Sequence, residues 1–368
     1  MIYLDNNATT PIDAEVAAAM LPFITENYGN PSSSHAMGRQ AKQAIDEARG
    51  QVAHLLNCHA DEIVFTGSGS EANNTILKGV AQAFQHKGRH IITSQIEHPS
   101  VIETCKFLES TGFKLTYLPV NHYGEVEIEQ LEKAISDETI LVSIMHSNNE
   151  TGTLQAIKEF AALCHSKDIL FHTDASQSLG KVDLDIKSLA VDFLTLAGPK
   201  LYAPKGIGGF YIGNDITIPA LVHGASHEQG RRAGTENVIF IVGLGKACEI
   251  AETTLRSAHM QQLTDYLHKG LEKIFGDRMQ LNGHPVKRLP NTLNISFLDF
   301  NSIKIMQCLS DVAVSAGSAC HADSTDISPV LAAMGLSTEA GLAAIRFSVG
   351  KQTSQQEIDI VLAKLAKL

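Results

Sequence analysis

Short apolar runs alternate with amphipathic segments through about the first 250 residues of the chain. Seven apolar runs predict strands, at residues 62–65, 90–94, 114–120, 139–145, 169–175, 191–197 and 208–213. Apolar residues spaced three and four apart predict helices between several of these strands, at residues 71–86, 100–110, 128–136 and 157–165, and one ahead of the first strand, at 39–56. This alternation is typical of an α/β domain with a mostly parallel sheet covered on both faces.

The pattern changes near Asn237. A long helical stretch over residues 237–275 leads to an apolar run at 293–297, a further strand near 312–317 and a terminal helix that begins near Ser354. These elements predict a smaller α+β domain attached through a long helix. We therefore expect a large α/β domain over residues 16–255, and a small domain that combines residues 1–15 with residues 256–368.

Composition argues against several classes of main partner and leaves a local basic pocket possible. Lys and Arg total 29 and Asp and Glu total 40, so the net charge is −11, which argues against nucleic acid or an anionic membrane as the main partner. We expect no secretory leader in MIYLDNNATTP and no membrane span, because no run approaches roughly 20 apolar residues. Its six cysteines are scattered without a CxxC pair, so we expect no metal site and no disulfides, but reduced thiols in a cytoplasmic setting.

The segment GSGSEA (67–72) follows the strand at 62–65 and opens a helix, so it matches the dinucleotide motif GxGxxA. A helix at 39–56 precedes the match, and the next strand does not end in the acidic residue that a ribose contact requires. We therefore expect a seat for one phosphate, at the N–H groups of Gly69 and Ser70. Ser70 is expected at the N-cap and Glu71 in the first turn.

Polar clusters follow several predicted strands directly. His98 lies in QIEHPS, Asn149 in SNNETG, Asp174 and Gln177 in DASQS, and Lys200 in AGPK. Because the carboxyl ends of parallel strands meet at one edge of a sheet, these clusters predict a single site there.

Two charged residues in these clusters carry specific expectations. Asp174 ends an apolar run and is expected to be buried, so it needs a partner, either a buried Lys or Arg or a protonated ring nitrogen. Lys200 follows Pro199 in a rigid, irregular loop, which suits an amine held for Schiff-base chemistry. Lys205, five residues on, is expected to be a solvated loop charge.

Two further residues stand out near the C-terminus. Cys320 lies beside His321 on the small-residue loop SAGSACHAD, where it is either an exposed nucleophile or an inert exposed thiol. Arg346 lies in the strand-like run IRFSVG and needs a carboxylate partner, from the protein or from a substrate.

A phosphate seat, a buried acid, a histidine and a loop lysine together describe a pyridoxal phosphate site. The sequence resembles the NifS/IscS-like cysteine desulfurases among the class V aminotransferase-like enzymes, and the related selenocysteine lyases. The resemblance covers essentially the whole chain and rests on YLDNNATTP, YGNPSSSH, TGSGSEANN, NNETG, HTDASQSLGK, RRAGTEN, SAGSACH and IRFSVGKQTSQQEID. It implies the fold of pyridoxal phosphate-dependent transferases of fold type I, with the cofactor in the large domain and the Cys320 loop in the small one.

The resemblance also implies roles around the cofactor ring. Lys200 would form the Schiff base with pyridoxal 5'-phosphate and then move the Cα proton of the substrate. Asp174 would hold the ring nitrogen protonated, and His98 would stack on the ring and shuttle protons. Gln177 and Asn149 would bond the ring oxygen or the substrate.

The remaining implied roles concern the phosphate, the substrate and the sulfur. Gly69 and Ser70 would take the phosphate, helped by Thr235 from the second subunit of a homodimer. Arg346 would hold the substrate carboxylate. The Cys320 thiolate would attack the sulfur of L-cysteine, forming a persulfide and releasing L-alanine. An acceptor such as an iron–sulfur scaffold would then take the sulfur, for iron–sulfur cluster assembly or thiolation.

The lysine loop departs from the family pattern. Desulfurases usually carry Ser-Gly-His-Lys or Ser-Ala-His-Lys, whereas this chain has Ala197, Gly198 and Pro199 before Lys200. Two cofactor donors are missing, which predicts weaker cofactor retention. The loss of the serine leans toward a selenocysteine lyase acting on L-selenocysteine, and a class V aminotransferase without desulfurase activity is a second alternative.

Overall fold

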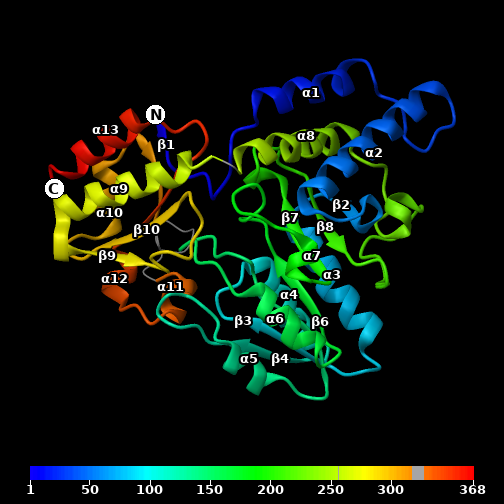
Figure 1. Ribbon diagram of the computed structural model, residues 1–368, viewed down its shortest axis with the longest axis horizontal. Helices are drawn as coiled ribbons and strands as arrows, with labels where there is room; N and C mark the ends of the chain where they lie inside the picture. Colours follow the sequence, from blue (N-terminus) through cyan, green and yellow to red (C-terminus); the bar gives the residue numbers. More distant parts are fainter. Residues whose placement is uncertain (256, 317–326) are drawn as a thin grey trace.

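The computed structural model describes residues 1–255, 257–316 and 327–368 (Figure 1). A seven-stranded sheet with helices on both faces forms one part of the molecule, and a four-stranded sheet with its own helices forms the other. No helix among the described residues combines the length and the apolar character that crossing a membrane requires.

The large sheet has the strand order β2-β8-β7-β6-β5-β3-β4. Its strands are β2 (Ile63–Thr66), β3 (His90–Ser94), β4 (Lys114–Leu118), β5 (Thr139–Ser143), β6 (Leu170–Asp174), β7 (Phe193–Ala197) and β8 (Gly208–Ile212). Only β8 runs antiparallel to its neighbours, and the other pairs are parallel. All seven predicted strands are present, and the prediction of a mostly parallel sheet is confirmed.

Both faces of this sheet are buried. Neighbouring residues of a strand point to opposite faces, and on this sheet they belong to two different cores. Ile92 and Leu194 belong to one core and Ile91 and Phe193 to the other. The first core contains residues of α2 (Ala36–Leu56), α5 (Ile128–Ala134), α6 (Ile157–His165), α7 (Ile186–Leu189) and α8 (Val238–Thr254). The second contains residues of α3 (Gly69–Phe84) and α4 (Pro99–Ser110). The helix α1 (Ala14–Thr25) adds Val16 to the first core.

The smaller part surrounds a separate core. Its sheet has the order β12-β13-β10-β9, from β9 (Met279–Asn282), β10 (Thr292–Phe297), β12 (Ser315–Ala316) and β13 (Ala344–Ser348). The N-terminal strand β1 (Ile2–Tyr3) pairs in parallel with β11 (Val312–Ala313) beside it. Its helices are α9 (His259–Phe275), α10 (Ser302–Cys308), α11 (Pro329–Ala333), α12 (Thr338–Leu342) and α13 (Gln355–Leu365). The domain division at residues 15/16 and 255/256 stays a prediction, and the separate cores are the observation in its favour.

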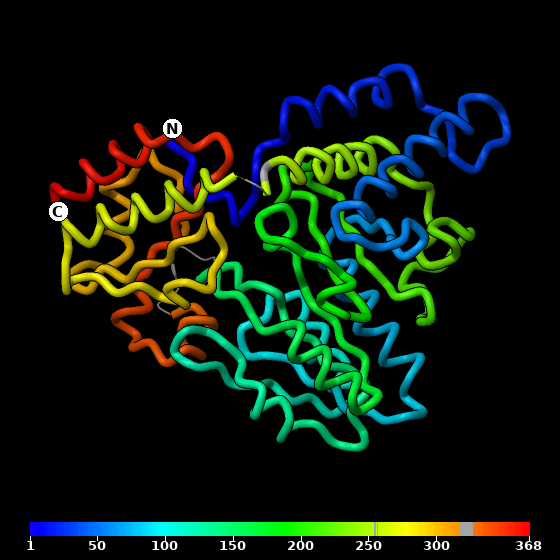
Figure 2. Tube along the Cα trace, viewed as in Figure 1, coloured from blue at the N-terminus to red at the C-terminus, as the bar shows by residue number. Residues whose placement is uncertain are grey.

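The expectation of one long helix over residues 237–275 is wrong. The stretch forms two helices, α8 and α9, and α9 starts at His259 after Ala258 (Figure 2). The division has a physical reason, since α8 packs against α1 and α2 of the large part, whereas α9 packs against α13 over the small sheet. Neither Pro nor Gly marks the change of direction in the sequence, so the apolar periodicity alone did not reveal it.

Candidate active site

Lys200 and Gln177 converge on one acceptor. The Nζ atom of Lys200 donates to the carbonyl oxygen of Asn7 at 2.9 Å and to that of Ala8 at 2.5 Å. The Nε2 atom of Gln177 donates to the same Asn7 oxygen at 2.9 Å. The loop after β7 and the turn after β6 therefore meet, and the lysine amine lies at the DASQS corner, as the strand pattern predicts.

The Lys200 loop is held from two sides. The backbone N–H and the Oγ1 of Thr10 donate to the carbonyl of Pro199 at 2.8 and 3.1 Å, and Tyr202 N donates to Thr10 Oγ1 at 2.7 Å. Tyr202 has a left-handed φ of 61°, and its hydroxyl accepts from the N–H of Lys351 at 2.7 Å. Burial lowers the pKa of Lys200, and Arg346 acts in the same direction. The amine is therefore both fixed in place and shifted toward its neutral form.

Asp174 is buried, and its hydrogen-bond donors in the described structure are neutral groups. Its side chain is 6% exposed, its Oδ1 accepts from Ser176 N at 2.9 Å, and its Oδ2 accepts from Asn73 Nδ2 at 2.8 Å. Among the described residues, no Lys or Arg forms an ion pair with it. Of the two partners expected from the sequence, this leaves the protonated ring nitrogen as the cation that the site fits.

A chain of hydrogen bonds joins Asp174 to His98. The same Nδ2 of Asn73 donates to Ser100 Oγ at 2.8 Å, and Ser100 Oγ lies 2.8 Å from His98 Nδ1. Ser100 N also donates to this Nδ1 at 3.1 Å, so His98 is the N-cap of α4. Desolvation by its surroundings, and secondarily Lys200, lower the pKa of His98, whereas Asp174 opposes them. These contacts favour a neutral ring with Nδ1 as the acceptor and the proton on Nε2.

The α3 N-terminus lies where the sequence predicts a phosphate seat, and it corrects the expected N-cap. The N-cap is Ser68, whose hydroxyl accepts from Glu71 N at 3.1 Å, so the expectation that Ser70 caps the helix is wrong. Since Ser68 satisfies Glu71 N, the N–H groups of Gly69 and Ser70 are the first-turn donors left for an anion. A Cβ at Gly69 would lie 3.2 Å from both Ala197 Cβ and Ser176 Oγ, so this turn lies against the lysine loop.

The acidic first-turn residue is neutralised. Glu71, located there as predicted, pairs with Arg232 at 2.8 Å between Oε1 and Nε, and its Oε2 accepts from Gly67 N at 2.9 Å. The pairing lowers the repulsion that a bare carboxylate would exert on a phosphate at the same helix end.

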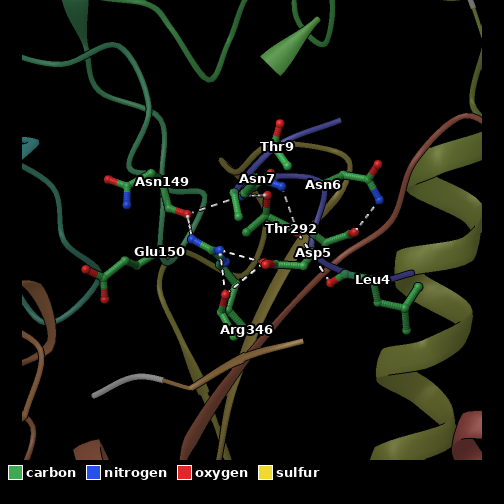
Figure 3. A network of polar contacts seen from close by, with 12 residues as sticks. Leu4, Asp5, Asn6, Asn7, Thr9, Asn149, Glu150, Thr292 and Arg346 are labelled. Carbon is green, nitrogen blue, oxygen red and sulfur yellow. Dashed lines mark hydrogen bonds and ion pairs between the residues drawn. The ribbon is translucent and has the colours of Figure 1, made fainter. Parts of the chain in front are cut away.

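Arg346 lies on β13 in a buried polar network (Figure 3). Its Nη2 donates to Asp5 Oδ1 at 2.7 Å and to Ser315 Oγ at 2.9 Å, and its Nη1 donates to Asn149 O at 2.9 Å. The buried Nε has no partner among the described residues. A protein acid, Asp5, therefore meets the guanidinium, and these three hydrogen bonds use three of its five N–H groups.

Asn149 enters this network through its backbone. Its carbonyl accepts from Arg346 and, at 3.2 Å, from Asn7 Nδ2, while its half-buried side chain points away from the guanidinium (Figure 3). Asn7 Nδ2 also donates to Thr292 Oγ1 at 2.8 Å. The structure thus places Asn149 at the site, and its side-chain role stays a prediction.

One predicted residue forms none of these contacts, and another lies outside the described residues. Thr235 is exposed on the segment before α8, and Cys320 with its neighbour His321 lies outside the described residues. Burial raises the pKa of Cys58, Cys105 and Cys164 to about 12, which disfavours a thiolate at these three positions.

Sequence reasoning assigned no role to several residues of this site. Asp5 and Asn7 belong to the polar run DNNATT at positions 5–10, and Asn73 lies on the buried face of α3. The run of six polar or small residues ahead of the first helix was a usable signal, since it is too polar for a strand and too short for a linker. Asn73 had a weaker signal, an amide at an otherwise apolar helix position.

Comparisons with known proteins agree with this geometry. The sequence model of the aminotransferase class-V family matches residues 2–361. A cysteine desulfurase IscS of Methanosarcina thermophila is 45% identical over 98% of this chain and 90% of its own length. A solved NifS-like protein superposes with a TM-score of 0.93 at 39% identity, covering 100% of this chain and 98% of that one. A structure described as SspA in complex with cysteine superposes with a TM-score of 0.85 at 38% identity, covering 95% of this chain and 99% of that one.

The fold and the residues at the carboxyl edge of its large sheet define a pyridoxal phosphate-dependent enzyme of fold type I. The chain belongs to the class-V aminotransferase family and, within it, to the cysteine desulfurases. The residues present fit the cofactor, which requires an acid for its ring nitrogen, an amine for its aldehyde and donors for its phosphate. They are a buried carboxylate that pairs with no cation of the described residues, a fixed amine and two first-turn helix N–H groups.

Proposed function

We infer that this protein is a pyridoxal phosphate-dependent cysteine desulfurase, which converts L-cysteine to L-alanine and retains the sulfur as a persulfide on Cys320. The single observation that carries this inference is the shared acceptor of Lys200 and Gln177, which holds the amine beside the buried Asp174 corner. When bound, the cofactor supplies an electron sink for charge that develops at the substrate Cα.

Lys200 has the properties of the base in this reaction. Its lowered pKa increases the neutral fraction of the amine, which is the form that accepts a proton. We propose that its Nζ binds the cofactor and, once released, removes the Cα proton of the substrate and returns a proton later. The strap formed by Thr10 limits how far the amine moves between these tasks.

Asp174 and His98 would set the electronic state of the site. Asp174, oriented by Asn73, would keep the ring nitrogen protonated, and His98 would pack its neutral ring on the cofactor. Gln177 would donate its second Nε2 hydrogen to the ring oxygen, and Asn149 would assist there or contact the substrate. The N–H groups of Gly69 and Ser70 would bind the phosphate.

Arg346 would bind the substrate carboxylate with the N–H groups that Asp5, Ser315 and Asn149 leave free. The Cys320 thiolate would then attack the substrate sulfur. The new S–S bond forms as the Cβ–S bond breaks, and the bonding pair stays with the carbon skeleton, which takes up a proton and leaves as L-alanine.

The finer assignments follow from the same proposal. We propose a homodimer in which the exposed Thr235 of a second subunit joins the phosphate site, and a sulfur-acceptor protein that receives the persulfide for iron–sulfur cluster assembly or thiolation. A cytoplasmic setting is supported by five free cysteines among the described residues. We also propose residues 16–255 and residues 1–15 with 256–368 as the two domains.

Borohydride reduction of the purified holoenzyme tests the central assignment. Reduction should fix the cofactor covalently to Lys200, detected by peptide mass spectrometry, and Lys200→Ala should abolish both the adduct and alanine formation from L-cysteine. Lys205→Ala is the matched control, because Lys205 is exposed in the same loop. An adduct at another lysine, or none, overturns the proposal. Comparing rates on L-cysteine and L-selenocysteine separates a desulfurase from a selenocysteine lyase, the alternative that Ala197 in place of the usual serine favours.

A further inference from the structure

Lys181 is a second buried lysine beside the site. It ends the turn after β6, four residues beyond Gln177, and its side chain is 9% exposed. Its Nζ donates to Gln177 Oε1 at 3.1 Å. No carboxylate pairs with this amine within the described part of the chain.

The absence of a counter-ion among the described residues makes burial of this amine costly in free energy. A buried lysine without an acidic partner is disfavoured in its charged form, and its long side chain also loses rotamer freedom. Burial lowers the pKa of Lys181 to about 7, and Lys200 and Arg346 shift it the same way. Lys181 lines a cavity together with Leu201 and Met260. An apolar side chain would fill this space equally well, so packing alone does not account for an amine at this position.

The contact of Lys181 decides which way the Gln177 amide points. A glutamine amide has one acceptor oxygen and one nitrogen with two donors, and the two ends have nearly the same shape. The Asn7 carbonyl only accepts, and it takes one hydrogen from Nε2 at 2.9 Å. The Lys181 amine donates to Oε1, the other end of the same amide. With both ends fixed, the second Nε2 hydrogen is the donor that remains for a ligand.

We propose that Lys181 is a positioning residue of the desulfurase, which acts through Gln177 by holding the amide with its nitrogen toward the cofactor ring oxygen. The proposal rests on the function inferred above, specifically on Gln177 as the donor to that oxygen. Lys181 would act through Gln177 and not on the cofactor or the substrate directly. The chain Lys181–Gln177–Asn7–Lys200 joins its amine to the reacting amine through three hydrogen bonds.

A pH titration of the visible absorption band of the lysine-bound cofactor tests this in the holoenzyme. A hydrogen-bond donor to the ring oxygen stabilises the anionic form of that oxygen. The oxygen then attracts the proton of the neighbouring imine less strongly, and the pKa of the imine is lower. Losing that donor should raise the midpoint of the titration. Lys181→Met keeps the apolar stem and should raise it by about 0.5 to 1 pH unit, the size of one net hydrogen bond.

Three variants separate positioning from a direct effect of charge. Gln177→Ala should raise the midpoint by a similar amount, and the double variant Lys181→Met/Gln177→Ala should match Gln177→Ala alone. Lys181→Gln restores a donor and should return the midpoint toward the wild-type value. Lys205→Met, which removes an exposed lysine of the neighbouring loop, should leave it unchanged.

Each outcome decides the question. An unchanged midpoint in Lys181→Met overturns the proposal, and so does a double variant whose shift is the sum of the single shifts, since Lys181 would then act by charge and not through Gln177. If the methionine variant does not fold, judged by circular dichroism, Lys181→Leu makes the same deletion. A wild-type protein without a lysine-bound band overturns the proposed function itself, whereas a normal band that no Lys181 variant shifts overturns only the positioning role.

Discussion

The carboxylate of Asp174 accepts a 2.8 Å hydrogen bond from Nδ2 of Asn73, a residue 101 positions earlier on α3. The helix that presents its N-terminus to the proposed phosphate thus also orients the acid proposed for the other end of the cofactor. One rigid element relates the two binding points, which fixes their separation before any ligand enters.

Replacing Asn73 should therefore weaken cofactor binding. Asn73→Ala leaves a buried carboxylate short of one donor, a loss of about 1.5–3 kcal/mol for a bond to a charged group, or roughly 10- to 150-fold in the dissociation constant. Fluorescence titration of the apoprotein with pyridoxal phosphate measures it. Asn74→Ala changes the neighbouring residue, which bonds only Ser70 O in the described structure, and should shift binding less than about threefold. Equal effects of the two variants would contradict the role of Asn73.

A substitution in the lysine loop should strengthen cofactor binding by adding a hydrogen-bond donor. Ala197 lies where a Cβ on Gly69 would almost touch it, so a hydroxyl at position 197 would lie beside the free N–H groups of α3. Ala197→Ser should tighten cofactor binding by about 0.5–1.5 kcal/mol, because it adds a donor near the phosphate. The dissociation rate of the cofactor, followed by absorbance during dialysis, measures the effect.

Position 199 tests the same idea with a backbone control. Pro199 contributes its carbonyl to Thr10, and any residue can supply that group. Pro199→His should slow cofactor release, whereas Pro199→Ala, which restores a backbone N–H but no side-chain donor, should change it little. A histidine variant that releases cofactor as fast as wild type would contradict the predicted weakness of the natural loop.

Much of this site was predictable because the sequence around each residue shows that it lies at the carboxyl end of a strand. His98, Asp174 and Lys200 each follow an apolar run, and parallel strands bring such ends together whatever lies between them. The strand positions followed from the apolar runs for the same reason, with ends displaced by one or two residues.

The remainder depended on contacts that no local pattern encodes. Asn7 reaches Gln177 and Lys200 only because the N-terminal segment crosses from the small sheet to the lysine loop, which the pattern of strands and helices does not specify. The Ser70 error has a smaller cause, since Ser68 and Ser70 are both good N-caps and the glycine between them decides where the helix starts.

Arg346 provides a test of substrate binding. Arg346→Lys keeps the charge but loses the planar set of N–H groups that Asp5, Ser315 and Asn149 share with the proposed carboxylate. We expect KM for L-cysteine to rise at least about 10-fold, which corresponds to roughly 1.4 kcal/mol. Arg278→Lys, at an arginine of the same part that is 48% exposed, should leave KM unchanged. A change in kcat alone would instead point to a role in the chemical step.

Glu97 should make stability depend on pH. Its Oε1 accepts from Ser94 Oγ at 2.6 Å and from Met145 N at 2.9 Å, and burial raises its pKa from 4.5 to about 8. The unfolded chain ionises this group above about pH 4.5, whereas the folded protein keeps it protonated to about pH 8. Its contribution is therefore full at low pH and declines as the pH rises through this window.

Glu97→Gln should remove that dependence. Relative to the variant, wild type should lose on the order of 5 kcal/mol of unfolding free energy between pH 4.5 and 8, measured by urea denaturation at several pH values. Glu132→Gln, at an exposed position, should follow the wild-type curve. Parallel wild-type and Glu97→Gln curves would show that Glu97 is ionised in the folded protein.

Cys320 can be separated from the rest of the machinery, because the lysine chemistry does not need a thiol. Cys320→Ala should keep the visible cofactor band and its response to L-cysteine, but lose more than about 100-fold in alanine formation, since no group then accepts the sulfur. Cys308→Ala, at a partly exposed cysteine whose thiol bonds Lys364 O, is the control and should retain full activity. If Cys320→Ala still released alanine from L-cysteine at the wild-type rate, the sulfur would leave without passing through this residue, and an aminotransferase-like or lyase reaction would explain the site better.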